Sequence, residues 1–377
     1  MALTERCFGS DPGGLEARMP HCFDDEHPAR HAIVKVDGKV VSHVVCVPAE
    51  LWAGDARVDC HGIAGVATDP AHRGNGYMHQ LLEFWLNRLD DRDVPIAELE
   101  GDRVRYGRYG WENAGREELY RITRRSFTAG RGASEDGANA IRRYRGAADI
   151  ETIQDVHGTE RYRVSRDRRR YERLLEQTGL ETLVFDGSQS AYLCYRGEDP
   201  ASVLEFGGSR EGVAALLECA LDATGEIAVY THPHHPLTDL FRELAAGWEC
   251  HPHRKLNVLD FPATIDAYRP LFEERWARTV DAFGSVADAV TLGMTSSSDR
   301  LADDTADTPT QSVTVAYDAS GVSVERTDRE PDVTFDRRGA VGFLFGSRDS
   351  CRSLKRIDPF LDAVLPLEYY FWQTETI

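Results

Sequence analysis

The stretch that decides the fold is "TDPAHRGNGYMHQLLEFW", residues 68–85. The segment before it, "CHGIAGVATDP", predicts a buried strand that ends at Asp69–Pro70. After Gly76 the apolar residues recur every three or four positions, which predicts an amphipathic helix. These apolar positions are Met78, Leu81, Leu82, Trp85, Leu86 and Leu89. The bare segment "HRGNG" is therefore a turn that leads from a strand into a helix.

This turn has the properties of an anion site. A helix N-terminus presents unpaired N–H groups and partial positive charge, glycines allow a ligand to approach them, and Arg73 adds a full charge. The turn lacks the Lys-Ser/Thr of a P-loop and the third glycine of the dinucleotide fingerprint. It resembles the R-x-x-G-x-G/A pyrophosphate turn of the GNAT acetyltransferases, read from Arg73 to Gly76. The alternative is a tight turn in which Arg73 is merely solvated.

Length and composition indicate a globular protein of several domains. With 377 residues, of which 41% are hydrophobic, the chain is expected to form two or three domains. Its apolar runs stay short of the ~20 residues of a membrane helix, and "MALTERCFGSDPGG" has no apolar signal core. We therefore expect a cytoplasmic protein with no membrane partner.

The charge is strongly acidic and the basic residues are almost all arginine. Asp and Glu number 63, the net charge is −19, and lysine occurs only at positions 35, 39, 255 and 355. Such a surface is typical of halophilic proteins, because molar salt shortens the Debye length to ~3 Å. The net charge argues against nucleic acid as a partner and favours cationic ones. The eight cysteines contain no C-x-x-C pair, which predicts reduced, mostly buried cysteines.

The first 130 residues predict a compact order of elements. Residues 31–53 form a hairpin around "VDGK". The strand at 58–68, the glycine turn and its helix follow. "VPIAELEGD" is a short strand, "RVRYGRYGWENAG" a short helix broken by glycines, and "EELYRITRRSF" a last strand of the same domain. This is the element order of a GNAT domain. The low-complexity stretch at 128–140 is interpreted as a linker.

Residues 141–258 repeat the same order in degraded form. "ETLVFDGSQSAYLCYRG" predicts a hairpin, and "ASVLEFGGSREGVAALLECALDA" is again strand, glycine turn and helix. The turn "FGGSREG" lacks the arginine and glycine register, and Glu211 would lie where the anion binds. We expect a second GNAT-like unit without cofactor; the alternative is an unrelated α/β domain. From residue 259, a helix, a polar loop at 295–311, a hairpin at 312–327 and a final helix predict a small α+β unit.

This layout resembles the enhanced intracellular survival (Eis) family of acetyltransferases. The resemblance rests on "GVATDPAHRGNGYM", "YGRYGW", "THPHHPL" and the C-terminal "FWQTETI". It implies an α/β (α+β) fold of two fused GNAT-like domains and a sterol-carrier-protein-like domain, with boundaries at 1–130, 141–258 and 259–377. It further implies acetyl-CoA as co-substrate of the first domain and a homo-oligomer, since family members are often hexamers.

The resemblance also implies the cofactor-binding residues. The backbone of Val66, Ala67 and Thr68 would pair with the pantetheine arm and supply the oxyanion donor. The pyrophosphate would lie beside Arg73, in a cradle formed by Gly74, Asn75, Gly76, Tyr77, Met78 and His79. Gly74 departs from the family, where many members carry a second arginine.

Acyl transfer to an amine needs a proton for the thiolate and a base for the amine. Tyr106 lies where the family places its general acid, and a phenol with a pKa near ~10 is protonated at neutral pH; Tyr109 is the competing tyrosine. The family's base is the terminal carboxylate, here that of Ile377, and the aromatic tail "EYYFWQTETI" agrees with a buried terminus. Glu98 and Glu100, on one face of a strand, are alternative bases or amine-binding groups.

Two further clusters are interpreted as structural. "THPHHP" carries three histidines, but the family has a similar turn without metal, so we expect no metal site. "RYRVSRDRRRYERLL" is rich in arginine, but the interleaved acids favour a solvated helix face over a nucleic-acid site.

The sequence therefore predicts an N-acetyltransferase that transfers acetyl from acetyl-CoA to an amine by direct attack in a ternary complex. The acceptor would be a polyamine, an aminoglycoside-like polycation or a lysine side chain. Two alternatives remain open. One is a longer-chain N-acyltransferase, and the other is a catalytically silent protein that binds acyl-CoA or lipid through its third domain.

Overall fold

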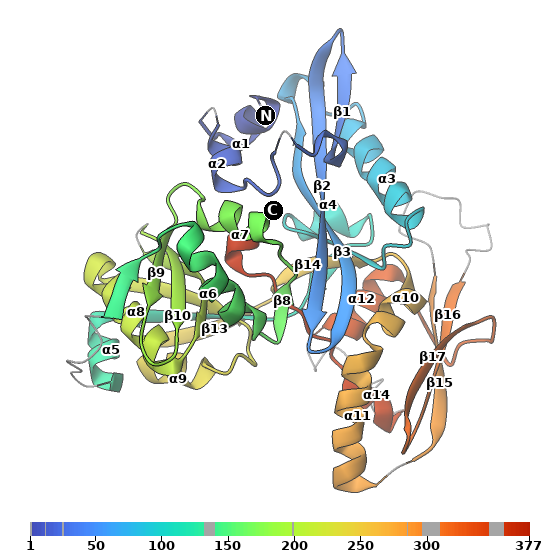
Figure 1. Cartoon of the computed structure of the whole chain (residues 1–377). Coiled ribbons are helices and arrows are strands. Elements are labelled where there is room, and N and C mark those ends of the chain that lie inside the picture. The colour runs from blue at the N-terminus through green and yellow to red at the C-terminus, as the bar shows by residue number, and fades with distance from the viewer. Residues whose placement is uncertain are drawn as a thin grey trace.

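In the part of the chain that it describes, a computed structural model contains three β-sheets with helices packed around them (Figure 1). None of the helices in the described part of the chain is long and apolar enough to cross a membrane. The structure describes residues 2–11, 13–24, 26–131, 140–197, 200–284, 286–295, 310–346 and 358–377. Most of the predicted linker at 128–140 and nearly all of the predicted polar loop at 295–311 lie outside these residues.

The first sheet is built on the long hairpin that the sequence predicts. Its turn uses Asp37 and Gly38, both at positive φ, which the Asp-Gly pair adopts readily. Strands β3 and β4 pair in parallel, and the other neighbours pair antiparallel. In spatial order the strands are β1 (His31–Val36), β2 (Lys39–Ala53), β3 (Ala56–Thr68), β4 (Ile96–Leu99), β14 (Arg254–Val258) and β5 (Glu112–Ala114), with β8 (Tyr162–Val164) beside β2.

The helix predicted from residue 77 is α3, Tyr77–Asp90, and it covers one face of this sheet. Its buried side chains are those of the predicted apolar stripe, Leu81, Leu82, Trp85, Leu86 and Leu89. They form one cluster with β-strand side chains such as Val44 and Ile63. On the opposite face lie α1 (Ala2–Phe8) and α2 (Gly14–Arg18), which leave a cavity between themselves and the β1–β2 hairpin.

The second sheet has the same strand directions as the first. Strands β11 and β12 pair in parallel, and the remaining pairs are antiparallel. Alternate residues of β10 are buried on opposite faces of the sheet. Leu193 packs on the side of α8 (Arg210–Thr224), and Tyr192 packs on the side of α6 (Ala147–Gly158) and α7 (Arg168–Leu175). The spatial order is β13 (Gly247–His251), β6 (Glu117–Thr123), β12 (Glu226–Thr231), β11 (Ala201–Gly208), β10 (Ala191–Arg196), β9 (Glu181–Phe185) and β7 (Ile141–Arg143).

The two sheets exchange strands, β8 of the second unit pairing with β2, and this corrects the expected course of the chain. From the sequence, the strand "EELYRITRRSF" is expected in the first domain. Its strand part is β6, which pairs with β12 and β13 of the second sheet, and Arg124–Arg131 form helix α5 instead. In return β14, from the end of the second unit, lies between β4 and β5 of the first sheet. Hydrophobic alternation gives the side-chain pattern of a strand but not its partner, so this exchange has no local signature.

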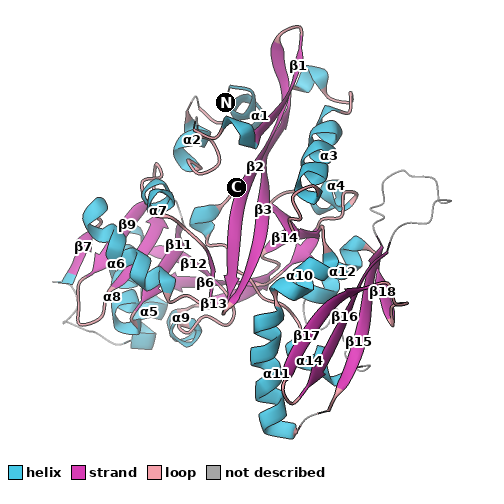
Figure 2. Cartoon of the chain, turned by 45° about the vertical axis from the view of Figure 1, so that its right-hand side comes forward, coloured by secondary structure: helices cyan, strands magenta, loops and turns pink. Residues whose placement is uncertain are grey.

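The third unit contains an antiparallel hairpin and a pair of consecutive helices. The expected single helix over 261–276 is two helices, α10 (Phe261–Ala267) and α11 (Arg269–Phe283), which meet at Tyr268. The sheet order is β17 (Gly321–Thr327), β16 (Thr310–Asp318), β15 (Asp288–Thr295) and β18 (Val333–Phe335). After the last helix the chain leaves this unit and returns between the first two sheets, as both views show (Figure 2).

The remaining helices fill the spaces around the sheets. They are α4 (Arg103–Gly107), α6 (Ala147–Gly158), α7 (Arg168–Leu175), α8 (Arg210–Thr224), α9 (Thr238–Leu244), α10 (Phe261–Ala267), α11 (Arg269–Phe283), α12 (Arg337–Phe345) and α14 (Pro359–Val364).

Candidate active site

The glycine turn before α3 is open and exposes the start of the helix. Gly74 and Gly76 have φ of 84° and 78°, and a Cβ built at either one meets nothing within 4 Å. Among the described residues, no side chain caps α3 at Gly76. Arg73 is exposed beside the turn, with its Nε 3.4 Å from the Thr68 carbonyl oxygen. The first-turn amides of α3 are therefore available to a phosphate group.

The equivalent turn in the second sheet is closed. Ser209 caps helix α8, its hydroxyl accepting from the Gly212 N–H at 3.1 Å. Glu211 stands in the first turn, as the sequence predicts. Gly208 packs against Ser190 and Ala191, so that a Cβ there would collide with backbone. A capped, acidic helix start rejects an anion, and only the α3 turn of the two fits a pyrophosphate.

Strand β3 continues past the end of β4 next to the open turn. Their parallel pairing runs from Cys60–Ile96 to Ile63–Leu99, where β4 ends, while β3 continues to Thr68. On this side the last five residues of β3 have no strand neighbour in the described part of the chain. An extended ligand can pair with such an edge as an added strand. Val66, Ala67 and Thr68, the predicted pantetheine partners, lie on this edge.

Tyr106 lies on the face of the first sheet that α3 covers, after the end of β4. Asp102 begins the short helix α4 by accepting from the Arg105 N–H at 2.6 Å. The Tyr106 ring packs so closely on Gly101 that a Cβ there would be 2.6 Å from it. The ring shares one hydrophobic cluster with Val66 and Met78. Burial raises the pKa of Tyr106, although Arg105 opposes this effect, so the phenol keeps its proton at neutral pH.

Tyr109 belongs to the same cluster but is held by other contacts. Its ring lies 5.7 Å from that of His79, between centroids, on the side of α3. Its carbonyl oxygen accepts from Asn257 Nδ2 of β14 at 2.8 Å. Tyr109 therefore joins α3 to the exchanged strand. Tyr77 and Met78 are half-buried at the start of α3, and His79 is exposed.

Glu98 and Glu100 face the other side of the sheet, toward Arg254 of β14. Glu98 is 1% exposed, and burial raises its pKa against the opposing effect of Arg254. Glu100, beyond the end of β4, is exposed and forms an ion pair with Arg254. The two carboxylates therefore have different environments: of the two, Glu98 is buried against the first sheet and Glu100 is exposed.

The C-terminal residue reaches the first sheet next to Glu98. A Cβ added to Gly62 would lie 2.5 Å from Ile377 Cδ1 and 3.1 Å from Glu98 Oε1. The Ile377 side chain also packs on a cluster that includes Phe23 and Ala64. Both views place the C-terminus beside β2 and β3 (Figure 1). The tail thus ends on the face of the sheet opposite Tyr106.

A buried ionic cluster holds the tail in this place. Arg166 Nη1 and Nη2 lie 2.8 and 2.9 Å from the Glu205 carboxylate oxygens, and its Nε lies 3.0 Å from Glu375 Oε1. All three side chains have 0% exposure. Thr374 also donates to Glu205, which lies on β11 beyond the end of its pairing with β12. In the second sheet, the tail therefore contacts the segment that corresponds to the open edge of β3.

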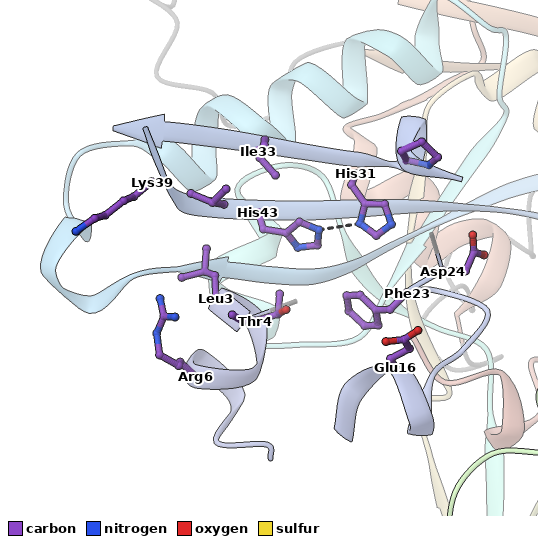
Figure 3. A pocket seen from close by; sticks show the side chains of 13 residues that line it. Leu3, Thr4, Arg6, Glu16, Phe23, Asp24, His31, Ile33, Lys39 and His43 are labelled. Atoms are coloured by element: carbon purple, nitrogen blue, oxygen red, sulfur yellow. Dashed lines mark hydrogen bonds between the residues drawn. The ribbon is translucent and has the colours of Figure 1, made fainter. Parts of the chain in front are cut away.

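A cavity of about 640 Å³ opens on the tail side of the first sheet (Figure 3). Helices α1 and α2 form one wall and the β1–β2 hairpin forms the other. Glu16 and Asp24 line it, together with the cations Arg6 and Lys39. Although burial acts against it, hydrogen bonds from His27 and Arg173 lower the pKa of Asp24. Phe23 lines this cavity and also belongs to the cluster against which Ile377 packs, so its side chain lies between the cavity and the end of the tail.

Two lining residues, His31 and His43, are absent from the sequence-based candidates. His43 Nε2 lies 2.9 Å from His31 Nδ1, and His43 Nδ1 lies 2.9 Å from the Gly65 carbonyl oxygen. Both histidines lie on the predicted 31–53 hairpin. That hairpin is the sequence feature that could have indicated that they lie close together.

The histidines of "THPHHP" serve separate contacts. His234 Nε2 lies 2.8 Å from Glu368, His235 Nε2 lies 3.1 Å from Glu160, and the His232 ring packs on Tyr162. No group of three or more metal-binding side chains occurs in the part of the chain that the structure describes. The turn therefore joins the second unit to the tail.

Comparisons with known proteins agree with this geometry. Residues 1–114 match the family model of the acetyltransferase (GNAT) domain. The chain is 29% identical over 120 residues to the uncharacterized N-acetyltransferase YhbS of Escherichia coli, covering 31% of this chain and 69% of that protein.

Among solved structures, a probable N-acyltransferase from Enterococcus faecalis is similar with a TM-score of 0.74 and 16% identity, covering 98% of this chain and 95% of the other. Eis1 from Mycobacterium abscessus is similar with a TM-score of 0.64 and 18% identity, covering 99% and 94%. At this identity the likeness shows the fold, and it extends over all three units.

GNAT acetyltransferases use acetyl-CoA as co-substrate. The N-terminal third of this chain therefore matches the GNAT domain, and the protein is an acyl-CoA-dependent N-acetyltransferase.

Proposed function

We propose that this protein is an Eis-like N-acetyltransferase that transfers acetyl from acetyl-CoA to a primary amine of a small polycation or a lysine side chain. One observation carries the proposal. Where the β3–β4 pairing ends, Tyr106 lies on one face of the sheet, and the cavity and the C-terminal tail lie on the opposite face. A thioester lying at the end of the β3–β4 pairing is then open to attack from the face that carries the cavity.

The cofactor contacts follow from the backbone. The α3 turn, from Arg73 to His79, would hold the pyrophosphate through its amides and the Arg73 charge. The edge from Val66 to Thr68 would pair with the pantetheine arm and direct an N–H at the acyl carbonyl, where negative charge develops. Exposed Arg73 is the one formal charge of the turn, since Gly74 provides none.

The reaction is a direct attack in a ternary complex. The neutral amine nitrogen bonds to the thioester carbonyl carbon, the carbon–sulfur bond breaks, and the thiolate takes the proton of the Tyr106 hydroxyl. Burial keeps that hydroxyl protonated until the thiolate forms. The proton that the amine loses goes to the α-carboxylate of Ile377, with Glu98 as the alternative acceptor, since the Ile377 side chain and Glu98 Oε1 both lie next to Gly62.

The acceptor class follows from charge. The net charge of −19 raises the local concentration of cations, and Glu16 offers a carboxylate at the cavity wall. A polyamine or another small polycation satisfies both conditions. We further propose that residues 141–258 form a GNAT-like unit without cofactor, supported by the capped start of α8 and the tail contact at Glu205.

The test is release of free CoA from acetyl-CoA with a panel of polyamines, aminoglycosides and lysine peptides, from low to multimolar KCl. The C-terminus is left untagged. Amine-dependent release is expected, and Tyr106→Phe is expected to lower kcat by about 10²–10⁴-fold. Tyr109→Phe is the matched control, expected to stay within about threefold because Tyr109 contacts α3 and β14.

The outcomes separate the alternatives. Release only with long-chain acyl-CoA would replace the acetyl donor by a longer acyl group. Binding of acetyl-CoA without release for any amine would refute the transferase proposal. Two residues added after Ile377 would move the terminal carboxylate and should abolish turnover while acetyl-CoA still binds; unchanged turnover would assign the base to Glu98.

A further inference from the structure

Strand β3 carries a bulge at Gly65, directly before the proposed cofactor edge. His43 of β2 is opposite Ala67, but Val45 is opposite Ala64, so β3 has one residue more than β2 between these pairs. Gly65 takes up the difference with φ of 56°. A Cβ there would lie 2.9 Å from Phe23 Cζ and 3.3 Å from His43 Cε1. Bulges of this kind redirect a strand next to active sites, and this one is packed closely from the cavity side.

On the cavity side of the sheet, a chain of two hydrogen bonds from His31 through His43 holds the bulge in place. The Gly65 carbonyl oxygen can only accept, so His43 Nδ1 carries a proton and donates across the 2.9 Å separation. Burial lowers the pKa of His43 to about 4, so its ring is neutral near pH 7 and Nε2 accepts. His31 Nδ1, 2.9 Å away, must then be the donor. Figure 3 shows the two rings joined in this way, with Phe23 beside them.

The hydrogen bond acts on one peptide group. The Gly65 carbonyl and the Val66 N–H belong to the same planar unit, so fixing the oxygen fixes the direction of the N–H. A bond donated to the oxygen also draws electron density from the nitrogen and strengthens the N–H as a donor. Val66 is the first residue of the edge proposed to face the acyl group, and it shares a cluster with Tyr106.

We propose that His43, oriented by His31, is a positioning residue that aims and polarises the Val66 N–H as the oxyanion donor of acyl transfer. This inference rests on the proposed function. His43 exchanges no proton in it. The amine still attacks the carbonyl carbon, the oxygen becomes the oxyanion against Val66, and Tyr106 still protonates the departing thiolate. The ring pair is held in place by Phe23, whose centroid lies 6.3 Å from His31 and 6.2 Å from His43.

Two substitutions form a matched pair. His43→Asn places an amide nitrogen as many bonds from Cα as Nδ1, and so keeps a donor for Gly65. His43→Leu has no donor. Both remove the Nε2 acceptor of His31, so they differ only in the hydrogen bond to the bulge. The loss of a whole oxyanion donor costs about 10²–10³ in kcat. Here the donor stays but is less well aimed, and we expect His43→Leu to lower kcat about tenfold and His43→Asn less than about threefold, both with unchanged KM for acetyl-CoA.

A spectroscopic readout tests the same contact without turnover. Isotope-edited infrared spectra of acetyl-CoA labelled with ¹³C at the thioester carbonyl are recorded on the wild-type protein and both variants, without amine. The carbonyl stretch is expected to lie at higher frequency in His43→Leu than in the wild type, because the hydrogen bond that the Val66 N–H donates to the carbonyl is weaker. In His43→Asn the frequency should return toward the wild-type value. If His43→Leu does not fold, His31→Leu removes the donor to Nε2 and should shift the stretch in the same direction.

Equal carbonyl frequencies and kcat in the wild type and His43→Leu would overturn the inference. An equal loss in both His43 variants would do so as well, because it would assign the effect to packing. The failure of the proposed function looks different, since the wild-type protein would then release no CoA with any amine.

Discussion

Replacing Arg166 by Met should detach the C-terminal tail from the second sheet. The guanidinium makes its 2.8–3.0 Å contacts to Glu205 and Glu375 with 0% exposure of all three side chains. Its loss leaves two buried carboxylates, with Arg170 3.6 Å from Glu375 as the nearby cation. Removing one partner of a buried ion pair costs about 3–5 kcal/mol, because the uncompensated charge stays buried.

The effect should depend on pH. Burial alone would raise the pKa of Glu205, but Arg166 lowers it to about 2 in the folded protein. The wild-type contact therefore adds stability above the unfolded pKa of about 4.3, and this is lost as the pH falls toward 2. In Arg166→Met the buried Glu205 carboxylate loses the cation that lowers its pKa and titrates at higher pH, so the variant regains stability when Glu205 is protonated. The difference between the two proteins should narrow from pH 7.5 to pH 4.5.

The assay is hydrogen–deuterium exchange of the tail, residues 369–377, with urea unfolding alongside. Tail exchange should accelerate about a hundredfold or more at pH 7.5. Arg168→Met is the matched control: its side chain is 54% exposed and pairs with Glu172 at i,i+4, so a change below about 0.5 kcal/mol is expected. Adding Glu205→Gln and Glu375→Gln to Arg166→Met should recover part of the loss. Tail exchange in Arg166→Met within threefold of the wild type would refute the reasoning.

Three further predictions concern helix starts. Gly76→Ala imposes a side chain at φ of 78° in open space, and should cost about 1 kcal/mol of stability and weaken CoA binding, as measured by calorimetry; unchanged affinity would contradict the anion role of the turn. Ser209→Ala removes the α8 cap and should lower stability by about 1 kcal/mol with CoA affinity unchanged, so a loss of affinity would place a ligand at the second turn. Asp102→Ala removes the cap of the helix that carries Tyr106 and should lower kcat more than it raises KM for acetyl-CoA; an equal change in both would show that Tyr106 keeps its position.

Local sequence patterns were sufficient to predict the helices, strands and turns of the site, but they did not predict which strands pair with one another. The Asp37-Gly38 turn, the apolar stripe of α3 and the glycines at 74 and 76 each follow from a few neighbouring residues. The sheet to which residues 117–123 belong depends on strands more than a hundred positions away, which no periodicity encodes.

The candidate site shows the same division. Tyr106 and the β3 edge follow from motifs and resemblance. The His43 contact to Gly65 arises because a bulge brings that carbonyl within reach of the neighbouring strand. A bulge is one extra residue in a pairing, so it becomes visible only when the pairing is known. The buried cluster of Arg166 is equally hidden, because its sequence context reads as a solvated helix face.

The exchange of β6 and β14 also sets an order of events at the ribosome. Strand β4 can pair with β3 soon after residue 99 has emerged, but its other edge stays bare until residues 254–258 are made. At about 5–20 residues per second this takes roughly 10–30 s. During that interval the cofactor half of the site has an exposed strand edge, which is a template for pairing with other chains. The first sheet is thus completed only after the second has been synthesised, and a fragment cut between them would lack the strand that covers β4.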